Sequence, residues 1–90
     1  MDFEYDQLKS ESNKINHGID FEEAIGLWED EEAVQILLPF EAEERYLVIG
    51  LLEERHWSAV ITYRETRIRI ISVRRSRDEE KKLYDNSRRV

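Results

Sequence analysis

The residues best suited to chemistry in this sequence are arginines that gather in its second half. Seven of them fall between residues 55 and 77: Arg55, Arg64, Arg67, Arg69, Arg74, Arg75 and Arg77. A guanidinium group is planar and donates paired hydrogen bonds, so a group of arginines is suited to binding phosphate. Apolar residues alternate with them, which predicts two strands, at residues 57–64 and 67–75, joined by a tight turn at 65–66. The alternative interpretation is that they are ordinary solvated arginines on a strand surface.

The register of the second strand decides which arginines act together. Strict alternation would mix Arg67 and Arg69 with apolar side chains on one face. A bulge near Ile70 and Ile71 would instead separate the polar residues from the apolar ones. We expect the bulge, with these residues on one face: Arg67, Arg69, Ser72 and Arg74. Arg64 and Arg69, which flank the hairpin, would converge on one phosphate. If the bulge exists, Arg74 would join them.

Length and composition limit the class of protein. The 90 residues are enough for one domain, which we expect to span 1–90, with a single core. No run is long enough to span a membrane, and the absence of cysteine fits a cytoplasmic protein. The two histidines, His17 and His56, lie far apart in unrelated contexts, so we expect no metal site, and nothing in the sequence indicates a cofactor.

The net charge of −7 hides an uneven distribution. Residues 1–54 hold 16 acidic and 3 basic side chains, a net of −13, whereas residues 55–90 hold 5 acidic and 11 basic side chains, a net of +6. The basic half can still attract phosphate locally, because salt screens charges beyond a Debye length of about 8 Å. The acidic half favours solubility and, as an alternative, docking of a partner with basic segments.

The chain before the arginines predicts a short strand and two helices. Residues 3–5 alternate apolar and polar, as a strand does. Asp6 is expected to cap a helix that runs to about Asn16 and stops at Gly18, and its thin apolar stripe predicts a surface position.

A second helix should begin at Asp20, which forms a capping box with Glu23. Its apolar residues recur at the spacing of one helical face: Phe21, Ala24, Ile25 and Trp28. The acidic run 29–32 ends this helix and should be solvated.

The middle of the chain predicts two further strands. Residues 33–38 form one, ended by the following proline, and 40–44 form an acidic loop. Residues 45–52 are apolar on both faces, as in a central strand covered by helices, and Gly50 marks a close approach of the backbone. A hairpin turn at 53–56 then leads into the arginine-bearing strands.

The chain should close with a helix that has a capping box at Ser76 and Glu79. The predicted fold class is therefore α+β: a short N-terminal strand, two helices, an antiparallel meander of three to four strands and a C-terminal helix. We expect the helices to gather against one face and to leave the other face of the sheet free.

Two sets of residues, in consistent order and spacing, carry a family resemblance. In the first part of the chain they are Phe3-Glu4-Tyr5-Asp6, Lys9, Asn13, His17-Gly18-Ile19 and Phe21-Glu22-Glu23-Ala24. In the later part they are Glu44-Arg45, Ile49-Gly50, Thr62-Tyr63-Arg64, Arg69-Ile70-Ile71-Ser72, Arg74, Glu80 and Tyr84. Together they resemble the BrnT family. The chain departs from the family's pattern where Asn16 replaces a lysine, Glu65 replaces a glycine, and Val73 and Ser76 replace alanines.

The resemblance implies the toxin of a bacterial type II toxin–antitoxin pair. Such a toxin is a small cytoplasmic ribonuclease with a fold similar to RelE and barnase. The implied partners are an RNA substrate and a BrnA-like antitoxin that holds the toxin inactive. The antitoxin also binds operator DNA, so the toxin would meet that DNA only through its partner.

Cleaving RNA without a metal ion needs a base for the 2′-hydroxyl, positive charge for the phosphorane and an acid for the leaving oxygen. With the resemblance, Arg64 and Arg69 are the candidates for stabilising the phosphorane, and Arg67 and Arg74 are candidates for binding RNA.

Four further residues are candidates, each with an alternative. His17 suits acid–base work, or is an imidazole that interacts with the end of its helix. Glu44 is a candidate base beside Arg45, or a solvated loop residue. Lys9 contacts phosphate or is solvated. Tyr63 stacks on a base, acts as an acid, or packs in the core, since alternation places it opposite Arg64.

Two functions are consistent with these residues. The first is a metal-independent endoribonuclease toxin that a cognate antitoxin neutralises. The second is a catalytically weak binding module of the same fold, acting as the partner and co-repressor of the antitoxin. Asn16 and the −13 charge of residues 1–54 motivate the second function.

Overall fold

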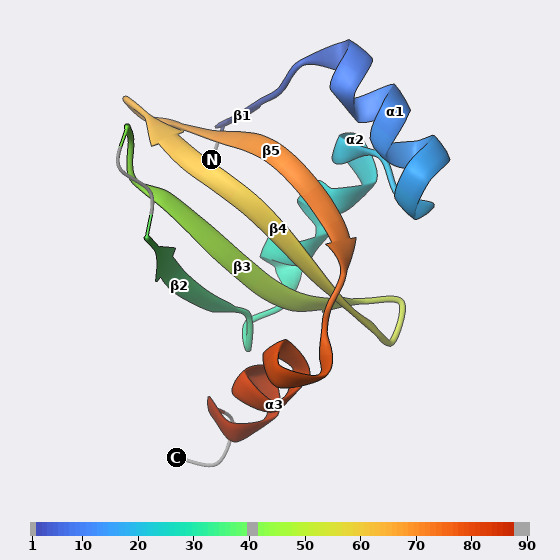
Figure 1. Cartoon of the computed structure of the whole chain (residues 1–90), viewed down its shortest axis with the longest axis vertical. Helices are drawn as coiled ribbons and strands as arrows, with labels where there is room; N and C mark the ends of the chain where they lie inside the picture. The colour runs from blue at the N-terminus through green and yellow to red at the C-terminus, as the bar shows by residue number, and fades with distance from the viewer. Residues whose placement is uncertain (1, 40–41, 88–90) are drawn as a thin grey trace.

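Alternating apolar residues in the second half of the chain build the sheet around which the molecule is organised. The computed structural model describes residues 2–39 and 42–87. Its strands are β1 (Asp2–Glu4), β2 (Val34–Leu38), β3 (Arg45–Leu52), β4 (Arg55–Arg64) and β5 (Arg67–Arg75). They form one five-stranded sheet in the order β1-β5-β4-β3-β2 (Figure 1).

The sheet is mixed, which corrects the expectation of an antiparallel meander of three to four strands. Strands β2 to β5 are antiparallel to their neighbours, as predicted. The N-terminal strand β1, however, adds to the outer edge of β5 in parallel, with Phe3 opposite Ile68 and Glu4 opposite Arg69. The short run of residues 2–4 did not by itself indicate which edge it would join.

The bulge predicted for the arginine-bearing strand is present in β5. Val60 pairs with Ser72 and the next residue, Ile61, pairs with Ile70, so Ile71 is the extra residue. Because of this insertion, Ile68, Ile70 and Val73 all reach the core and are at most 2% exposed. The polar residues of β5 therefore share the opposite face, which we call the arginine face: Arg67, Arg69, Ser72 and Arg74.

The hairpin turn at 65–66 lies where it was expected, but the turn expected at 53–56 comprises only 53–54, because Arg55 and His56 already belong to β4. Glu53 and Glu54 join β3 to β4 with positive φ angles of 52° and 65°, and Glu65 has a φ of 57° in the turn between β4 and β5. Two-residue hairpin loops need such left-handed conformations, which glutamate adopts less readily than glycine or asparagine. The long strand pairing on either side must hold these turns.

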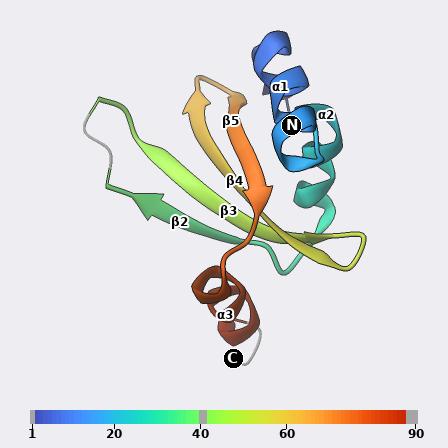
Figure 2. The same ribbon diagram turned by 45° about the vertical axis from the view of Figure 1, so that its right-hand side comes forward.

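The other face of the sheet, the helix-covered face, packs against α1 (Gln7–His17), α2 (Phe21–Ala24) and the 3₁₀ helix η1 (Ile25–Glu29) (Figure 2). The predicted second helix is thus one α-helical turn followed by 3₁₀ helix. The predicted apolar stripe faces the core: Phe21 and Ala24 are buried, and Ile25 and Trp28 pack partly buried against them. Leu27 is buried as well, because a 3₁₀ helix has 3.0 residues per turn and so aligns Leu27 with Ala24. The capping box at Asp20 and Glu23 is confirmed.

Helix α1 has the predicted ends and surface position. The Asp6 side chain caps it by accepting from Lys9 N, and Gly18 ends it with a φ of 79°. It packs on β5 through a buried amide: Asn13 Nδ2 donates to Val73 O at 2.9 Å and to Ile19 O at 2.8 Å. The apolar residues of the helix point outward instead, since Leu8 and Ile15 are 74% and 84% exposed.

The closing helix, α3 (Asp78–Ser87), corrects the expectation that one face of the sheet stays free. It packs on the arginine face at the β2–β3 side, where Tyr84 is buried against Leu47 and Ile49 (Figure 1). Its cap also lies one residue later than predicted, because Glu80 Oε1, rather than Glu79, accepts from the backbone N of Arg77 at 2.9 Å. None of the described helices is long and apolar enough to cross a membrane.

The acidic run 29–32 was expected to be solvated, and for Asp30 this expectation is wrong. Asp30 Oδ2 accepts from Leu51 N at 2.8 Å and from Tyr84 Oη at 2.7 Å. Gly50 allows η1 to pack closely on β3, since a Cβ there would lie 3.3 Å from Leu27 Cδ2 and 3.5 Å from Asp30 Oδ2. In the acidic loop predicted at 40–44, residues 40 and 41 lie outside the described residues.

Candidate nucleic-acid interface

Three arginines meet at the end of the sheet where β4 turns into β5. Arg64 pairs directly with Arg67 across the hairpin, and Arg69 pairs with Thr62. Residues 67 and 69 alternate with the buried residues 68 and 70 of β5, and their pairing partners in β4, residues 64 and 62, lie on the same face, so all four project from the arginine face. We call Arg64, Arg67 and Arg69 the arginine cluster.

The arginine cluster closes around one carboxylate, that of Glu4. Arg69 Nη1 donates to Glu4 Oε2 at 2.9 Å, Arg64 Nη1 lies 3.9 Å from the same oxygen, and Arg67 Nη1 lies 3.7 Å from Oε1. The parallel pairing of β1 with β5 delivers Glu4 to this position. The hydrogen bond from Arg69, with the nearby charge of all three arginines, lowers the pKa of Glu4 below its ordinary value.

The members of the cluster differ in their exposure to solvent. The side chains of Arg64 and Arg67 are 55% and 62% exposed, whereas that of Arg69 is 28% exposed. Arg69 is therefore held by Glu4 against the sheet, while the other two guanidinium groups remain accessible to an anion from solution. Three guanidinium groups that converge on one carboxylate can also converge on one phosphate, because both anions accept paired hydrogen bonds in a plane.

Arg74 shares the arginine face, as predicted, but lies at its other end. Strand geometry puts it about 15 Å from Arg69 along β5. Its Nη1 and Nη2 donate to the two carboxylate oxygens of Glu80, each at 2.8 Å. Ser58 Oγ also donates to Glu80 Oε1, at 2.9 Å. Arg74 therefore attaches α3 to the sheet and is not grouped with the arginine cluster.

Lys9 and His17 belong to α1, in the layer that packs on the helix-covered face, and both are exposed. Nothing in the described contacts brings either side chain to the arginine cluster. Tyr63 also projects from the helix-covered face: its ring meets Tyr46 edge-on, and its hydroxyl donates to Gln35 Oε1 at 2.6 Å. With 46% of its surface exposed, Tyr63 lies at the rim of the core.

The backbone carbonyl of Glu44 lies next to the arginine cluster, whereas its side chain points elsewhere. Its carbonyl accepts from Thr62 Oγ1 at 2.7 Å, next to Arg69, while its carboxylate accepts from Tyr46 Oη at 2.8 Å. Since Tyr46 belongs to the helix-covered core, the carboxylate is drawn away from the arginine face.

Sequence reasoning did not select two residues of this region. Glu4 and Arg45 were named in the family resemblance and in the predicted strands, but neither was selected as a site residue. Arg45 projects beside Thr62 at the same end of the arginine face, and its Nε donates to Glu43 Oε2 at 3.1 Å. The charge of Glu4 could have indicated its position, because a carboxylate in a strand next to arginine-rich strands is expected to form an ion pair with one of the arginines.

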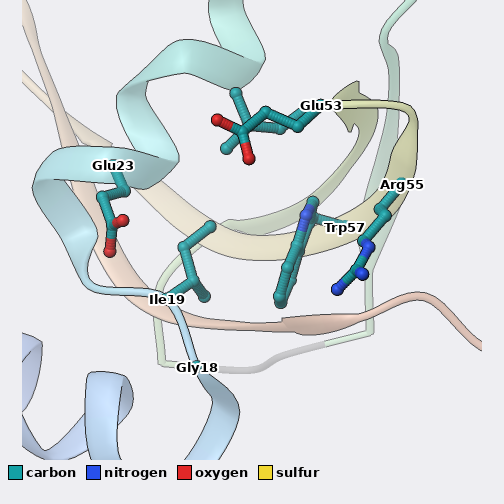
Figure 3. Close-up of a pocket in the computed structure, with 7 residues that line it drawn as sticks. Gly18, Ile19, Glu23, Glu53, Arg55 and Trp57 are labelled. Atoms are coloured by element: carbon teal, nitrogen blue, oxygen red, sulfur yellow. The ribbon is translucent and has the colours of Figure 1, made fainter.

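The structure also has a cavity of about 480 Å³, but on the helix-covered face (Figure 3). Its lining comes from the segment after α1 and from the β3–β4 hairpin: Gly18, Ile19, Glu23, Leu52, Glu53, Arg55 and Trp57. It contains none of the candidate site residues. Within residues 2–39 and 42–87, no three His, Asp or Glu side chains are grouped in a way that could hold a metal ion.

The fold and the arginine cluster define a small α+β protein with three arginines gathered on one face of its sheet. Residues 5–80 match the family model described as the ribonuclease toxin BrnT of type II toxin–antitoxin systems. The chain therefore belongs to the BrnT family, as the sequence resemblance indicated. This family indicates a ribonuclease toxin and implies an antitoxin as its partner. A search of curated proteins found no match.

Proposed function

We propose that this chain is a metal-independent endoribonuclease that cleaves RNA by attack of the 2′-hydroxyl on the adjacent phosphate. A BrnA-like antitoxin neutralises it in the bacterial cytoplasm, and operator DNA is contacted only through that antitoxin. The observation that carries the proposal is the convergence of Arg64, Arg67 and Arg69 on a single anionic group within 4 Å.

In this mechanism the arginines supply the positive charge that the reaction needs. Attack of the 2′-oxygen creates a phosphorane with more negative charge than the starting phosphodiester, and donors already in place stabilise it most. Arg64 and Arg69 contact the reacting phosphate, and Arg67 holds the RNA at that position. The proposed step assigns no role to Lys9, His17, Glu44, Tyr63 or Arg74, because no described contact joins their side chains to the arginine cluster.

The test is cleavage of a mixed-sequence RNA in EDTA by the wild type and by Arg64→Ala. Wild type should release fragments with 2′,3′-cyclic phosphate ends, and the variant should be about 100- to 1000-fold slower, the usual cost of one such donor. Arg55→Ala is the matched control, because it removes the same charge from the other end of β4, where Arg55 lines the cavity. It should cleave as wild type does.

Two outcomes contradict the proposal. Equal cleavage by wild type and Arg64→Ala would mean that the arginine cluster is not the site. No cleavage by folded wild type would favour the alternative, a binding module that acts as the antitoxin's partner and co-repressor.

A further inference from the structure

We infer that Glu4 is the general base that removes the proton from the 2′-hydroxyl of the RNA. The inference rests on the proposed function, and it assigns a residue to the part of the reaction that the arginines cannot perform. An arginine stays protonated at any physiological pH, so a base must come from another side chain.

The position of Glu4 carries this inference. A general base must lie within hydrogen-bond reach of the hydroxyl next to the reacting phosphate. Glu4 lies inside the arginine cluster, 2.9 to 3.9 Å from its guanidinium groups, so a phosphate bound there is a direct neighbour of the carboxylate. Glu43 and Glu44 instead accept hydrogen bonds from Arg45 and Tyr46.

Glu4 also has the chemical state that the step requires. Its side chain is 23% exposed, so a substrate can reach it. Oε2 accepts from Arg69, while Oε1 lies 3.7 Å from Arg67 Nη1, beyond hydrogen-bond distance, and keeps lone pairs for a proton. The arginines keep the carboxylate ionised, and a phosphate that draws Arg64 and Arg67 toward itself would make Glu4 more basic when the RNA is bound.

The reaction transfers one proton to Glu4, forms one bond to phosphorus and breaks another. Glu4 takes the proton of the 2′-hydroxyl while O2′ forms a bond to phosphorus. The bond from phosphorus to O5′ then breaks, and O5′ leaves as a hydroxyl with a proton from solvent water. Glu4 returns its proton to the solvent, and the products are a 2′,3′-cyclic phosphate and a 5′-hydroxyl end.

The experiment compares wild type, Glu4→Gln and Asp2→Asn on the same RNA across pH 3 to 8. Glutamine keeps the size of the side chain and an oxygen that accepts from Arg69, but it cannot take the proton. We expect kcat to fall about 100-fold or more, in the range of general-base catalysis, with KM unchanged or lower. Asp2→Asn, which removes a carboxylate from the same face of β1, should leave kcat unchanged.

The pH profile separates a base from a residue that only positions Arg69. Wild-type kcat/KM should decrease below the ordinary pKa range of glutamate as one group is protonated, and the residual activity of Glu4→Gln should lack this decrease. Glu4→Gln with a kcat within threefold of wild type, or a wild-type profile without the acid limb, overturns the inference and leaves the proposed function standing. Wild type that does not cleave RNA overturns both. Circular dichroism confirms that each variant is folded. If Glu4→Gln does not fold, the presence or absence of the decrease in wild-type kcat/KM at low pH tests the inference.

Discussion

At the scale of single residues, Asp30 shows how one carboxylate can join three parts of the fold. It follows η1, accepts from the backbone of β3 at Leu51, and accepts from the hydroxyl of Tyr84 in α3. Tyr84 is 1% exposed, so removing this carboxylate takes a hydrogen-bond acceptor from a buried hydroxyl. Losing such a hydrogen bond is costly because water does not readily replace it in a buried site.

We therefore predict that Asp30→Ala lowers the free energy of unfolding by about 2 to 4 kcal/mol, since it removes the acceptor of the hydrogen bonds from Leu51 N and Tyr84 Oη. Urea denaturation measures this change. Glu31→Ala, in the same acidic run but exposed, is the matched control and should change stability by less than about 0.5 kcal/mol. Adding Tyr84→Phe to Asp30→Ala should cost less than the two single changes together, and full additivity would contradict the coupling.

At the scale of elements, α3 is attached to the sheet by one buried ionic contact. Glu80 accepts from Arg74 of β5, from Ser58 of β4 and from the backbone of Arg77, and its side chain is 12% exposed. The hydrogen bonds from Arg74 are the largest cause that lowers its pKa from 4.5 to about 2, against the opposing effect of burial. Folding thus favours the ionised form of Glu80.

The pH dependence of stability follows from the sign of that shift. A carboxylate with a lower pKa in the folded state stabilises the fold above its unfolded pKa of 4.5, and this contribution is lost as pH falls toward about 2. Glu80→Gln should therefore cost about 2 to 3 kcal/mol at pH 7 and progressively less below pH 4.5. Chemical denaturation of both proteins at several pH values measures the difference. A difference that stays constant from pH 7 to pH 2.5 would contradict the assignment.

At the scale of the whole molecule, the fold separates charge that the net value of −7 conceals. Arg64, Arg67 and Arg69 gather at one end of the arginine face, and α3 packs at the other end. Figure 1 shows α3 at the end of the sheet away from the turn between β4 and β5. Binding of nucleic acid to this protein should therefore be local, through the phosphate held by the arginine cluster, and not through a general attraction to the surface.

A salt titration tests this expectation. Each phosphate neutralised on a single strand contributes about −0.7 to the slope of log K against log salt, so a cluster that holds one phosphate predicts a slope of about −0.7. The probe is single-stranded DNA, which lacks the 2′-hydroxyl and is not cleaved. Arg64→Ala should make the slope shallower, and Arg55→Ala should not change it. The same slope for all three proteins would show that binding does not use the arginine cluster.

Local interactions explain which features could be predicted from the sequence. The caps at Asp6 and Asp20, the stop at Gly18 and the hairpins depend on residues a few positions apart, so their patterns are readable. The bulge at Ile71 was predictable for a similar reason, because only an inserted residue separates the arginines from the isoleucines. Family resemblance then indicated the class of protein from residues spread along the chain.

Contacts between distant residues decided the rest. Glu4 and Arg69 are 65 residues apart, and Asp30 and Tyr84 are 54 apart, so no local pattern indicates either pair. The sequence by itself determined the order of the elements, their approximate extents and the alternation that exposes arginines on one face. Only the tertiary structure decided that β1 pairs with β5 and that α3 covers part of the arginine face. It also decided that Arg74 binds Glu80 of α3, whereas the arginine cluster surrounds Glu4. The physical reason is that edge pairing and helix docking depend on which apolar surfaces remain to be buried after the local elements have formed.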